Sequence, residues 1–302
     1  MRDALTTHPD WLVRRWTTRF GPEETQRLIA WNDTRPPLVL QPIRWSLDRL
    51  TDELRASGID TTLAPFGAGL EVRAAHPASR IPHPPSLPGF AEGGWIVQDP
   101  AHALVARFAA IPKGQQVYDA CAAPGGKAVA LEAAGARLLA GDARHERIGR
   151  LAETTRRAGV AIQCVAANLE AAPLRLASVA AVLVDAPCSA TGTMRRHPDA
   201  RWRLQPTVFA RAAERQGRLL AAAASLVRPG GLLIYATCSL EPEENEHVVE
   251  SFLKRNPEFT RSPRPDAVAA DLLTAAGDFQ SLPQRHGIDG AYAARLERGG
   301  AR

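Results

Sequence analysis

Hydrophobic and polar positions follow a strand-and-helix rhythm from about residue 95 to the end of the chain. Short apolar runs that end in turn residues predict five strands, at 116–119, 137–142, 162–168, 180–185 and 232–237. Helical periodicity predicts helices at 126–134, 144–158 and 206–228, another helix opening at Pro242, and a turn and final strand at 287–298. Because strands and helices alternate, we expect an α/β fold with a mostly parallel, doubly wound sheet.

The first third of the chain has a different pattern. Aromatic and leucine residues at near-helical spacing predict two consecutive helices within 8–31, the second beginning at Pro22. Between 36 and 100, short apolar runs are mixed with many prolines, which predicts a small α+β region that ends in a proline-rich connector at 76–92. We therefore expect two domains, a small α+β module at 1–92 and a larger α/β domain at 93–302.

The composition is that of a globular protein, with 302 residues of which 45% are hydrophobic and 23% charged. The longest strongly apolar run, 219–227, is far shorter than the ~20 residues that a membrane helix needs. The N-terminus lacks the basic-then-apolar layout of a secretion signal, so we expect a cytoplasmic protein. Four cysteines without a CxxC pair predict free thiols and no metal site.

The charge of the chain is unevenly distributed. The first 95 residues are electrically balanced, so the whole excess of +5 lies in the remainder. Seven arginines lie within 195–218, which begins in the long loop that follows the fourth predicted strand. Clustered arginines can bind phosphates through bidentate hydrogen bonds, which makes nucleic acid a candidate partner. A solvated helix face explains the same pattern without a ligand, although a loop of ~20 residues favours a functional role.

Candidate chemistry is expected at the carboxyl edge of the sheet, where doubly wound folds bind their ligands. The residues that follow the predicted strands there are 119–127 (DACAAPGGK), Asp142, Asn168, Asp185 and 237–239 (TCS). The first loop places two glycines at a helix start, where the backbone can approach a ligand and offer free amides. Its spacing is neither that of a P-loop nor GxGxxG. Asp142 stands where a carboxylate bonds to the ribose of an adenosine ligand.

Three motifs in this order resemble those of the RNA 5-methylcytosine methyltransferases of the Sun/Fmu family: 119–127 (DACAAPGGK), 185–192 (DAPCSATG) and 235–239 (YATCS). The similarity is greatest to the bacterial small-subunit ribosomal RNA methyltransferase B type, which also has a counterpart of 195–199 (RRHPD). Further similarities in family order cover nearly the whole chain, at 32–37 (NDTRPP), 87–90 (LPGF), 97–99 (VQD), 242–245 (PEEN) and 289–290 (DG). The resemblance implies a Rossmann-like methyltransferase domain preceded by a small RNA-recognition-like module.

The resemblance also implies a cofactor, S-adenosyl-L-methionine, and a partner, RNA, with ribosomal RNA as the first expectation. The implied cofactor site consists of the first loop and polar residues after the next three strands: Cys121, Ala122, Ala123, Pro124, Gly125, Gly126, Lys127, Asp142, Asn168 and Asp185. Relatives commonly carry an aspartate where this chain has Asn168. Its amide oxygen can still accept from the adenine amino group, but without the charge we expect weaker cofactor affinity.

Two of the cysteines acquire catalytic roles from the resemblance. Cytosine C5 is a poor nucleophile until a thiolate adds to C6, breaks the aromaticity and makes C5 enamine-like. By similarity Cys238 is this nucleophile and Cys188 assists release of the methylated RNA. If the fourth and fifth strands are neighbours, about 4.8 Å apart, the two thiols emerge side by side. Cys121 and Cys164 are more simply interpreted as small buried residues.

Two charged residues complete the implied site. Asp185 would stabilise the charge that develops on the cytosine ring. Lys127 would lower the thiol pKa or hold the cofactor loop, and its simpler interpretation is a lysine at a helix N-terminus. The target cytosine must leave its stack to reach the thiols, which favours a loop or another single-stranded segment.

Several alternatives stay open at this point. Longer relatives begin with a helical RNA-binding domain that we do not find here, so substrate choice is expected to depend on the small module and on 195–218. Transfer RNA remains a possible substrate, whereas the second cysteine motif, 237–239, argues against DNA. A non-catalytic RNA-binding assembly factor is an alternative of another class, and the intact cysteine pair argues against it. We expect a monomer with no membrane or metal partner.

Overall fold

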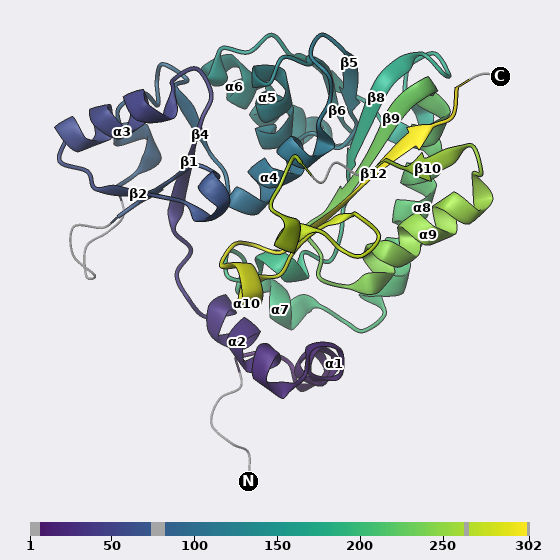
Figure 1. Cartoon of the computed structure of the whole chain (residues 1–302), viewed down its shortest axis with the longest axis horizontal. Coiled ribbons are helices and arrows are strands. Elements are labelled where there is room, and N and C mark those ends of the chain that lie inside the picture. The colour runs from purple at the N-terminus through teal and green to yellow at the C-terminus, as the bar shows by residue number, and fades with distance from the viewer. Residues whose placement is uncertain (1–6, 74–81, 263–265, 301–302) are drawn as a thin grey trace.

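The computed structural model describes residues 7–73, 82–262 and 266–300, and Figure 1 shows their arrangement. A small antiparallel sheet with one helix lies beside a larger, mostly parallel sheet with helices on both faces. The predicted connector at 76–92 lies partly outside the described residues, since 76–81 belong to the undescribed segment.

The large sheet has the order β10-β12-β9-β8-β5-β6-β7, with β11 paired to β12. Strands β5 to β9 are parallel, and β12 joins β9 antiparallel at one side. The strand order reverses between β5 and β8, so this is the switch point at which such sheets bind ligands. The α/β prediction is confirmed. The strands are β5 (Gln116–Asp119), β6 (Arg137–Asp142), β7 (Gln163–Ala166), β8 (Val179–Asp185), β9 (Val227–Thr237), β10 (Phe259–Arg261), β11 (Phe279–Ser281) and β12 (Ala291–Arg298).

Alternate side chains of the central strands pack against helices on opposite faces. Val182 and Val184 contribute to a core with α8 and α9, whereas Ala181 and Leu183 contribute to a core with α4 and α5. This period of two is why a continuous apolar run makes a strand that is buried on both sides. The helices are α4 (Pro100–Ala109), α5 (Gly126–Ala133), α6 (His145–Ala158), α7 (Ala200–Arg203), α8 (Val208–Leu226), α9 (Glu246–Arg255) and α10 (Pro283–His286). The helix expected from Pro242 is in fact a single 3-10 turn, Pro242–Glu244, followed by α9.

The small sheet has the order β2-β3-β1-β4, antiparallel throughout, and packs against α3. Its last strand, β4, pairs with β1 and lies beyond the predicted domain boundary at 92. The small sheet is therefore completed by residues that the sequence pattern assigned to the larger domain, and the division at 92/93 stays a prediction. The elements are β1 (Leu38–Pro42), α3 (Leu47–Ala56), β2 (Thr61–Leu63), β3 (Leu70–Val72) and β4 (Trp95–Val97).

The first two helices, α1 (Asp10–Phe20) and α2 (Pro22–Asn32), lie below the large sheet in Figure 1, next to α7 and α10 and apart from α3. Trp16 of α1 is fully buried and its indole N–H donates to Glu241 at 3.0 Å. Arg15 also pairs with Glu241, at 2.5 Å. These helices thus support the segment that follows β9, although the sequence pattern grouped them with the small module.

Candidate functional site

Three aspartates end neighbouring parallel strands at the switch point: Asp119 on β5, Asp142 on β6 and Asp185 on β8. A cavity of about 290 Å³ opens at this edge of the sheet. Six of the residues predicted from the sequence line it, namely Cys121, Ala123, Asp142, Asp185, Cys188 and Cys238. The structure therefore brings the two predicted catalytic cysteines and four of the ten predicted cofactor-binding residues into one space.

The two catalytic candidates among the cysteines face each other across β8 and β9. The Sγ atoms of Cys188 and Cys238 are 3.3 Å apart, which is hydrogen-bond distance for sulfur. The hydrogen bond to Cys238, together with burial, raises the pKa of Cys188 well above its ordinary value. Cys188 therefore holds its proton strongly, and its S–H can donate in a hydrogen bond to the sulfur of Cys238.

A buried carboxylate, Glu244, holds the two cysteine loops together. It accepts hydrogen bonds from the backbone amide of Ser189 at 2.8 Å and from the hydroxyl of Ser239 at 2.5 Å. The side chain of Gln216, from α8, donates to the same carboxylate at 3.1 Å. Since each serine directly follows one of the cysteines, Glu244 fixes the separation of the two thiols. The sequence pattern predicts only a helix start at Pro242, and Glu244 falls in the family-like stretch 242–245 (PEEN), to which no site role was assigned.

Lys127 and Asp185 form an ion pair below the cavity, with Nζ 2.7 Å from Oδ2. Burial works against the charge on Lys127, yet the adjacent carboxylate raises its pKa above the ordinary value. Lys127 does not line the cavity itself, and it is therefore placed to orient Asp185 while Asp185 faces the ligand space.

His102 is a site residue that sequence reasoning missed. It lies on α4, lines the cavity and is 3.1 Å from Lys127 through Nδ1. Burial, followed by the positive charge of Lys127, lowers the pKa of His102 to about 4, so the ring is neutral at pH 7. A neutral ring that accepts from Lys127 at Nδ1 carries its proton on Nε2. No motif contained this histidine, and only its position three residues after Asp99 at a helix start could have drawn attention to it.

Asp142 and Arg147 in the cavity wall are polar groups that can bond to the ribose of a nucleoside cofactor. Asp142 is buried, and its Oδ2 has no hydrogen-bond partner among the described residues, although Arg147 lies 3.2 Å away. Arg147 also donates to the carbonyl of Ala123. An unsatisfied buried carboxylate oxygen at the end of β6 fits a ribose hydroxyl. The residues present therefore fit the expected nucleoside cofactor.

The glycines of the first loop allow close packing at this wall. Gly125 has φ +113°, a backbone conformation that favours glycine, and a Cβ there would lie 2.9 Å from Leu151. A Cβ on Gly126 would lie 2.9 Å from the amide nitrogen of Gln98. Ala122, Pro124 and both glycines lie outside the cavity lining, so their predicted contacts with a cofactor stay predictions.

Asp119 is completely enclosed, and neither of its carboxylate oxygens has a hydrogen-bond partner within the described part of the chain. Burial, and then the negative charge of Asp185, raises the pKa of Asp119 to about 7. Burial likewise raises the pKa of Cys121, to about 12, which keeps that cysteine a neutral thiol. The prediction that Cys121 is not a nucleophile agrees with this environment.

Asn168 is less clearly part of the site. It is exposed, does not line the cavity, and its Oδ1 accepts from the amide of Glu170 at 3.2 Å, capping a short 3-10 turn. Its predicted contact with adenine stays a prediction.

Most of the arginines within 195–218 are bound to protein groups. Arg195 and Arg196 both pair with Asp99 and Asp289, which are buried. Arg201 is buried against Asp33, whereas Arg215 lines the catalytic cavity. The expectation of a cationic surface along this segment is therefore wrong for three of its seven arginines, because their charges are neutralised inside the protein.

No helix in the described part of the chain is long and apolar enough to cross a membrane. Within the same residues, no group of three or more His, Cys, Asp or Glu side chains is arranged to hold a metal ion.

Comparisons with known proteins agree with the geometry. Residues 108–297 match the family described as 16S rRNA methyltransferase RsmB/F, and residues 8–78 match a ferredoxin-like domain of RsmF/B-like methyltransferases. Ribosomal RNA small subunit methyltransferase B of Pseudomonas syringae is 35% identical over 98% of this chain and 68% of its own length. These matches confirm the resemblance drawn from the three motifs.

Two solved structures are also similar. The crystal structure of PH0851 has a TM-score of 0.87 and 28% identity over 96% of this chain and 66% of its own. The structure of NSun6 from Pyrococcus horikoshii with SFG has a TM-score of 0.80 at 19% identity, covering 98% of this chain and 100% of its own. The second of these shows a shared fold alone. The chain thus spans about two thirds of the length of the bacterial relative and of PH0851.

Proposed function

The chain belongs to the RsmB/F family of 16S rRNA methyltransferases, and on that premise we propose that it methylates cytosine C5 in small-subunit ribosomal RNA. S-adenosylmethionine is the proposed methyl donor, and a cysteine adduct at cytosine C6 is the proposed intermediate. The observation that carries the proposal is the pair of thiols 3.3 Å apart in the cavity that also exposes Asp142 and Asp185.

The nucleophile in this proposal is Cys238. Its thiolate adds to C6 of the cytosine, the C5–C6 double bond opens, and the electron pair makes C5 able to attack an electrophilic carbon. S-adenosylmethionine supplies that carbon as a methyl group on a sulfonium. Loss of the proton from C5 then restores the double bond and expels the Cys238 thiolate, so that the protein is regenerated.

Cys188 suits the release step because its protonation depends on Cys238. While Cys238 is free, its sulfur accepts the Cys188 proton in a hydrogen bond and keeps the pKa of Cys188 raised. Once the sulfur of Cys238 is bonded to carbon, this stabilisation of the Cys188 proton is lost. Cys188 can then release its proton to the solvent and, as a thiolate, accept the proton that leaves C5.

Asp185 and Lys127 act on the cytosine ring as a unit. Asp185 lies in the cavity wall close to the cysteine loops, and Lys127 holds one of its oxygens at 2.7 Å. A carboxyl group oriented in this way can bond to the ring nitrogen N3 or the exocyclic amine of the target base and stabilise charge as the adduct forms. Asp142, with its unsatisfied oxygen, is the proposed ribose-binding residue for the cofactor.

The substrate and compartment belong to the same proposal. The P. syringae relative is named for the small ribosomal subunit, which supports ribosomal RNA over transfer RNA. The solved NSun6 structure contains SFG, an analogue of S-adenosylmethionine, which supports the choice of methyl donor. Because the proposed chemistry needs two free thiols, a reducing compartment such as the cytoplasm suits it.

The test is methyl transfer from S-adenosylmethionine labelled in its methyl group. Small-subunit ribosomal RNA from a strain that lacks this protein is the substrate, and bisulfite sequencing locates the product. We expect label at cytosine C5 with the native protein, and a loss of at least about 10³-fold with Cys238→Ser. An undiminished rate with Cys238→Ser, or label at another atom, contradicts the mechanism. Label only in transfer RNA contradicts the substrate.

A further inference from the structure

A second hollow, of about 550 Å³, lies between the end of α2 and the segment around α7. It is separate from the catalytic cavity, because no residue lines both. Its wall contains Asn32 and Arg35 from one side, and Arg201 and Trp202 from the other. We call it the Trp202 groove.

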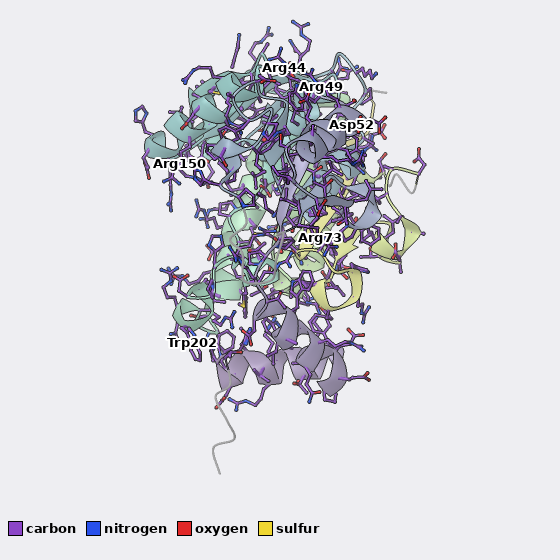
Figure 2. All side chains as sticks on the ribbon, turned by 90° about the vertical axis from the view of Figure 1, so that its left-hand side faces the viewer. Arg44, Arg49, Asp52, Arg73, Arg150 and Trp202 are labelled. Carbon is purple, nitrogen blue, oxygen red and sulfur yellow. The ribbon has the colours of Figure 1, made fainter. Side chains whose placement is uncertain are left out.

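Trp202 is the most conspicuous residue of the groove. Its side chain is 58% exposed, and it is one of four large apolar side chains that are exposed in the described part of the chain. Figure 2 shows it at the lower left of that view, beside the first two helices. A single exposed apolar residue is ordinary on a protein surface and by itself indicates nothing. The inference of a binding site therefore depends on the residues around Trp202.

Two buried polar side chains in the groove wall have unsatisfied atoms. Asn32 and Arg201 are 2% and 3% exposed, and neither Oδ1 of Asn32 nor Nε of Arg201 has a hydrogen-bond partner within the described residues. An unsatisfied buried donor or acceptor is costly, and most such groups in folded proteins are paired. The groove wall thus contains one buried acceptor and one buried donor that no described residue satisfies.

The hydrogen bonds around His8 determine which side-chain atom of Asn32 has no hydrogen-bond partner. The Thr7 hydroxyl donates to Asp33 at 2.6 Å, so it accepts from Nδ1 of His8 at 2.9 Å, a closer contact than the 3.5 Å between that nitrogen and Arg201. Burial, and then the charge of Arg201, lowers the pKa of His8 to about 4, so its Nε2 is an acceptor at pH 7. Nε2 lies 3.1 Å from the amide nitrogen of Asn32, which leaves the amide oxygen as the free acceptor.

The charges of the groove are nearly balanced, which limits what it can bind. Arg201 is paired with Asp33 at 2.7 Å, and Arg195 is paired with Asp99 and Asp289. Arg35 is exposed and forms no ion pair with any described residue. A groove with one free cation and one exposed indole suits a flat, polar aromatic group that carries a single phosphate better than it suits a polyanion.

The groove is joined to the catalytic cavity by a short piece of chain. Ala190 lines the cavity, and the backbone amide of Gly192 donates to the carbonyl of Cys238 at 2.9 Å. Arg195, three residues further along, already lines the groove, and three residues span at most about 11 Å. A single RNA strand that places one base at Cys238 can therefore reach the groove within a few nucleotides.

We propose that the Trp202 groove binds an unpaired nucleobase of the RNA substrate, a few nucleotides from the target cytosine. The base stacks on Trp202, and Arg35 contacts the adjoining phosphate. An exocyclic amine or ring imino N–H of the base donates to Asn32, and a carbonyl oxygen of the base accepts from Arg201. The proposal rests on the proposed function only in taking RNA as the ligand.

The test is direct binding of fluorescein-labelled decauridylate, followed by anisotropy at several salt concentrations. This probe contains no cytosine, so it reports binding even if the proposed methylation fails. We expect Trp202→Ala to weaken binding about 5- to 100-fold without changing the salt dependence, because stacking releases no counterions. Arg35→Ala should instead reduce the slope of log K against log salt by about 0.7, the value for one phosphate of a single strand.

Two further variants separate stacking from a general effect on the fold. Trp202→Phe keeps an aromatic face and should recover most of the affinity. Leu176→Ala removes a side chain that is 72% exposed near the start of β8, at the opposite edge of the sheet, and should bind like the native protein. With ribosomal RNA as methyl acceptor, Trp202→Ala should raise KM and leave kcat nearly unchanged. Binding that Trp202→Ala does not weaken, or native protein that does not bind the probe, overturns the proposal.

Discussion

The sulfur atoms of Cys188 and Cys238 lie 3.3 Å apart although 50 residues separate them in the chain. They are brought together because each follows one of two adjacent parallel strands, β8 and β9, and because Glu244 binds the serine after each cysteine. The close contact makes the protonation of one thiol depend on the state of the other. This dependence underlies the first prediction.

Cys188→Ala should accumulate a covalent complex between protein and RNA. If Cys188 accepts the C5 proton, its loss stops the step that expels Cys238, while formation of the adduct continues. Denaturing gel electrophoresis with labelled RNA and S-adenosylmethionine should show a slowly migrating band. The band should vanish in the double variant Cys188→Ala with Cys238→Ala. Its absence from the single variant contradicts the division of roles between the two cysteines.

Lys127→Met should destabilise the protein by leaving Asp185 without its partner. Removing one member of a buried ion pair costs ~3–5 kcal/mol, and because Asp185 is 32% exposed we expect about 1–3 kcal/mol. The double variant with Asp185→Asn should recover much of that loss, since no charge is then left unpaired. Urea unfolding of the four proteins gives the coupling energy, and strictly additive effects would argue against the pair.

Asp119→Asn should change how stability depends on pH. Burial raises the pKa of Asp119 from 3.8 to about 7, so between these values the folded protein holds a proton that the unfolded chain has lost. The contribution of Asp119 to the free energy of unfolding is therefore most favourable near pH 4, and it becomes less favourable as the pH rises to 7. Asp119→Asn, which is neutral at every pH, should match the native protein near pH 4 and exceed it by up to ~4 kcal/mol at pH 8.

The measurement is the free energy of unfolding without cofactor at pH 4, 6 and 8. Asp199→Asn is the control, because it removes the charge of an aspartate that is 69% exposed. A constant difference between Asp119→Asn and the native protein across this range would contradict the buried, protonated carboxyl.

Asp142→Asn should weaken the binding of S-adenosylhomocysteine about 10- to 100-fold, the effect of losing a charge-assisted hydrogen bond to ribose. Asn168→Ala should lower the affinity for S-adenosylhomocysteine less than Asp142→Asn does, since Asn168 is exposed and outside the cavity wall. Asn168→Asp should strengthen binding if the missing charge lowers cofactor affinity, as we expect from the sequence. Isothermal titration calorimetry compares the three variants, and a larger loss from Asn168→Ala than from Asp142→Asn would reverse our ranking.

The sequence by itself determined the order of the five parallel strands and of the helices α5, α6 and α8 that lie between them. It also predicted which polar residues follow these strands at the edge of the sheet. Runs such as 180–184 are apolar at every position, and a parallel strand buried on both faces requires that pattern. The carboxyl ends of parallel strands meet at one edge, so Asp142, Asp185 and the two cysteines could be assigned to one site before any coordinates.

Only the tertiary structure decided which distant groups meet. Arg195 and Arg201 were expected to be available for RNA, yet they are buried against Asp289 and Asp33. His102 entered the site, and α1 and α2 joined the larger domain, although no sequence pattern predicted it. Glu244 entered the site although its stretch predicted only the start of a helix. The physical reason is that periodicity and turn residues encode burial and chain direction within an element. The partner of a buried charge depends instead on how elements far apart in the chain pack, which no local pattern records.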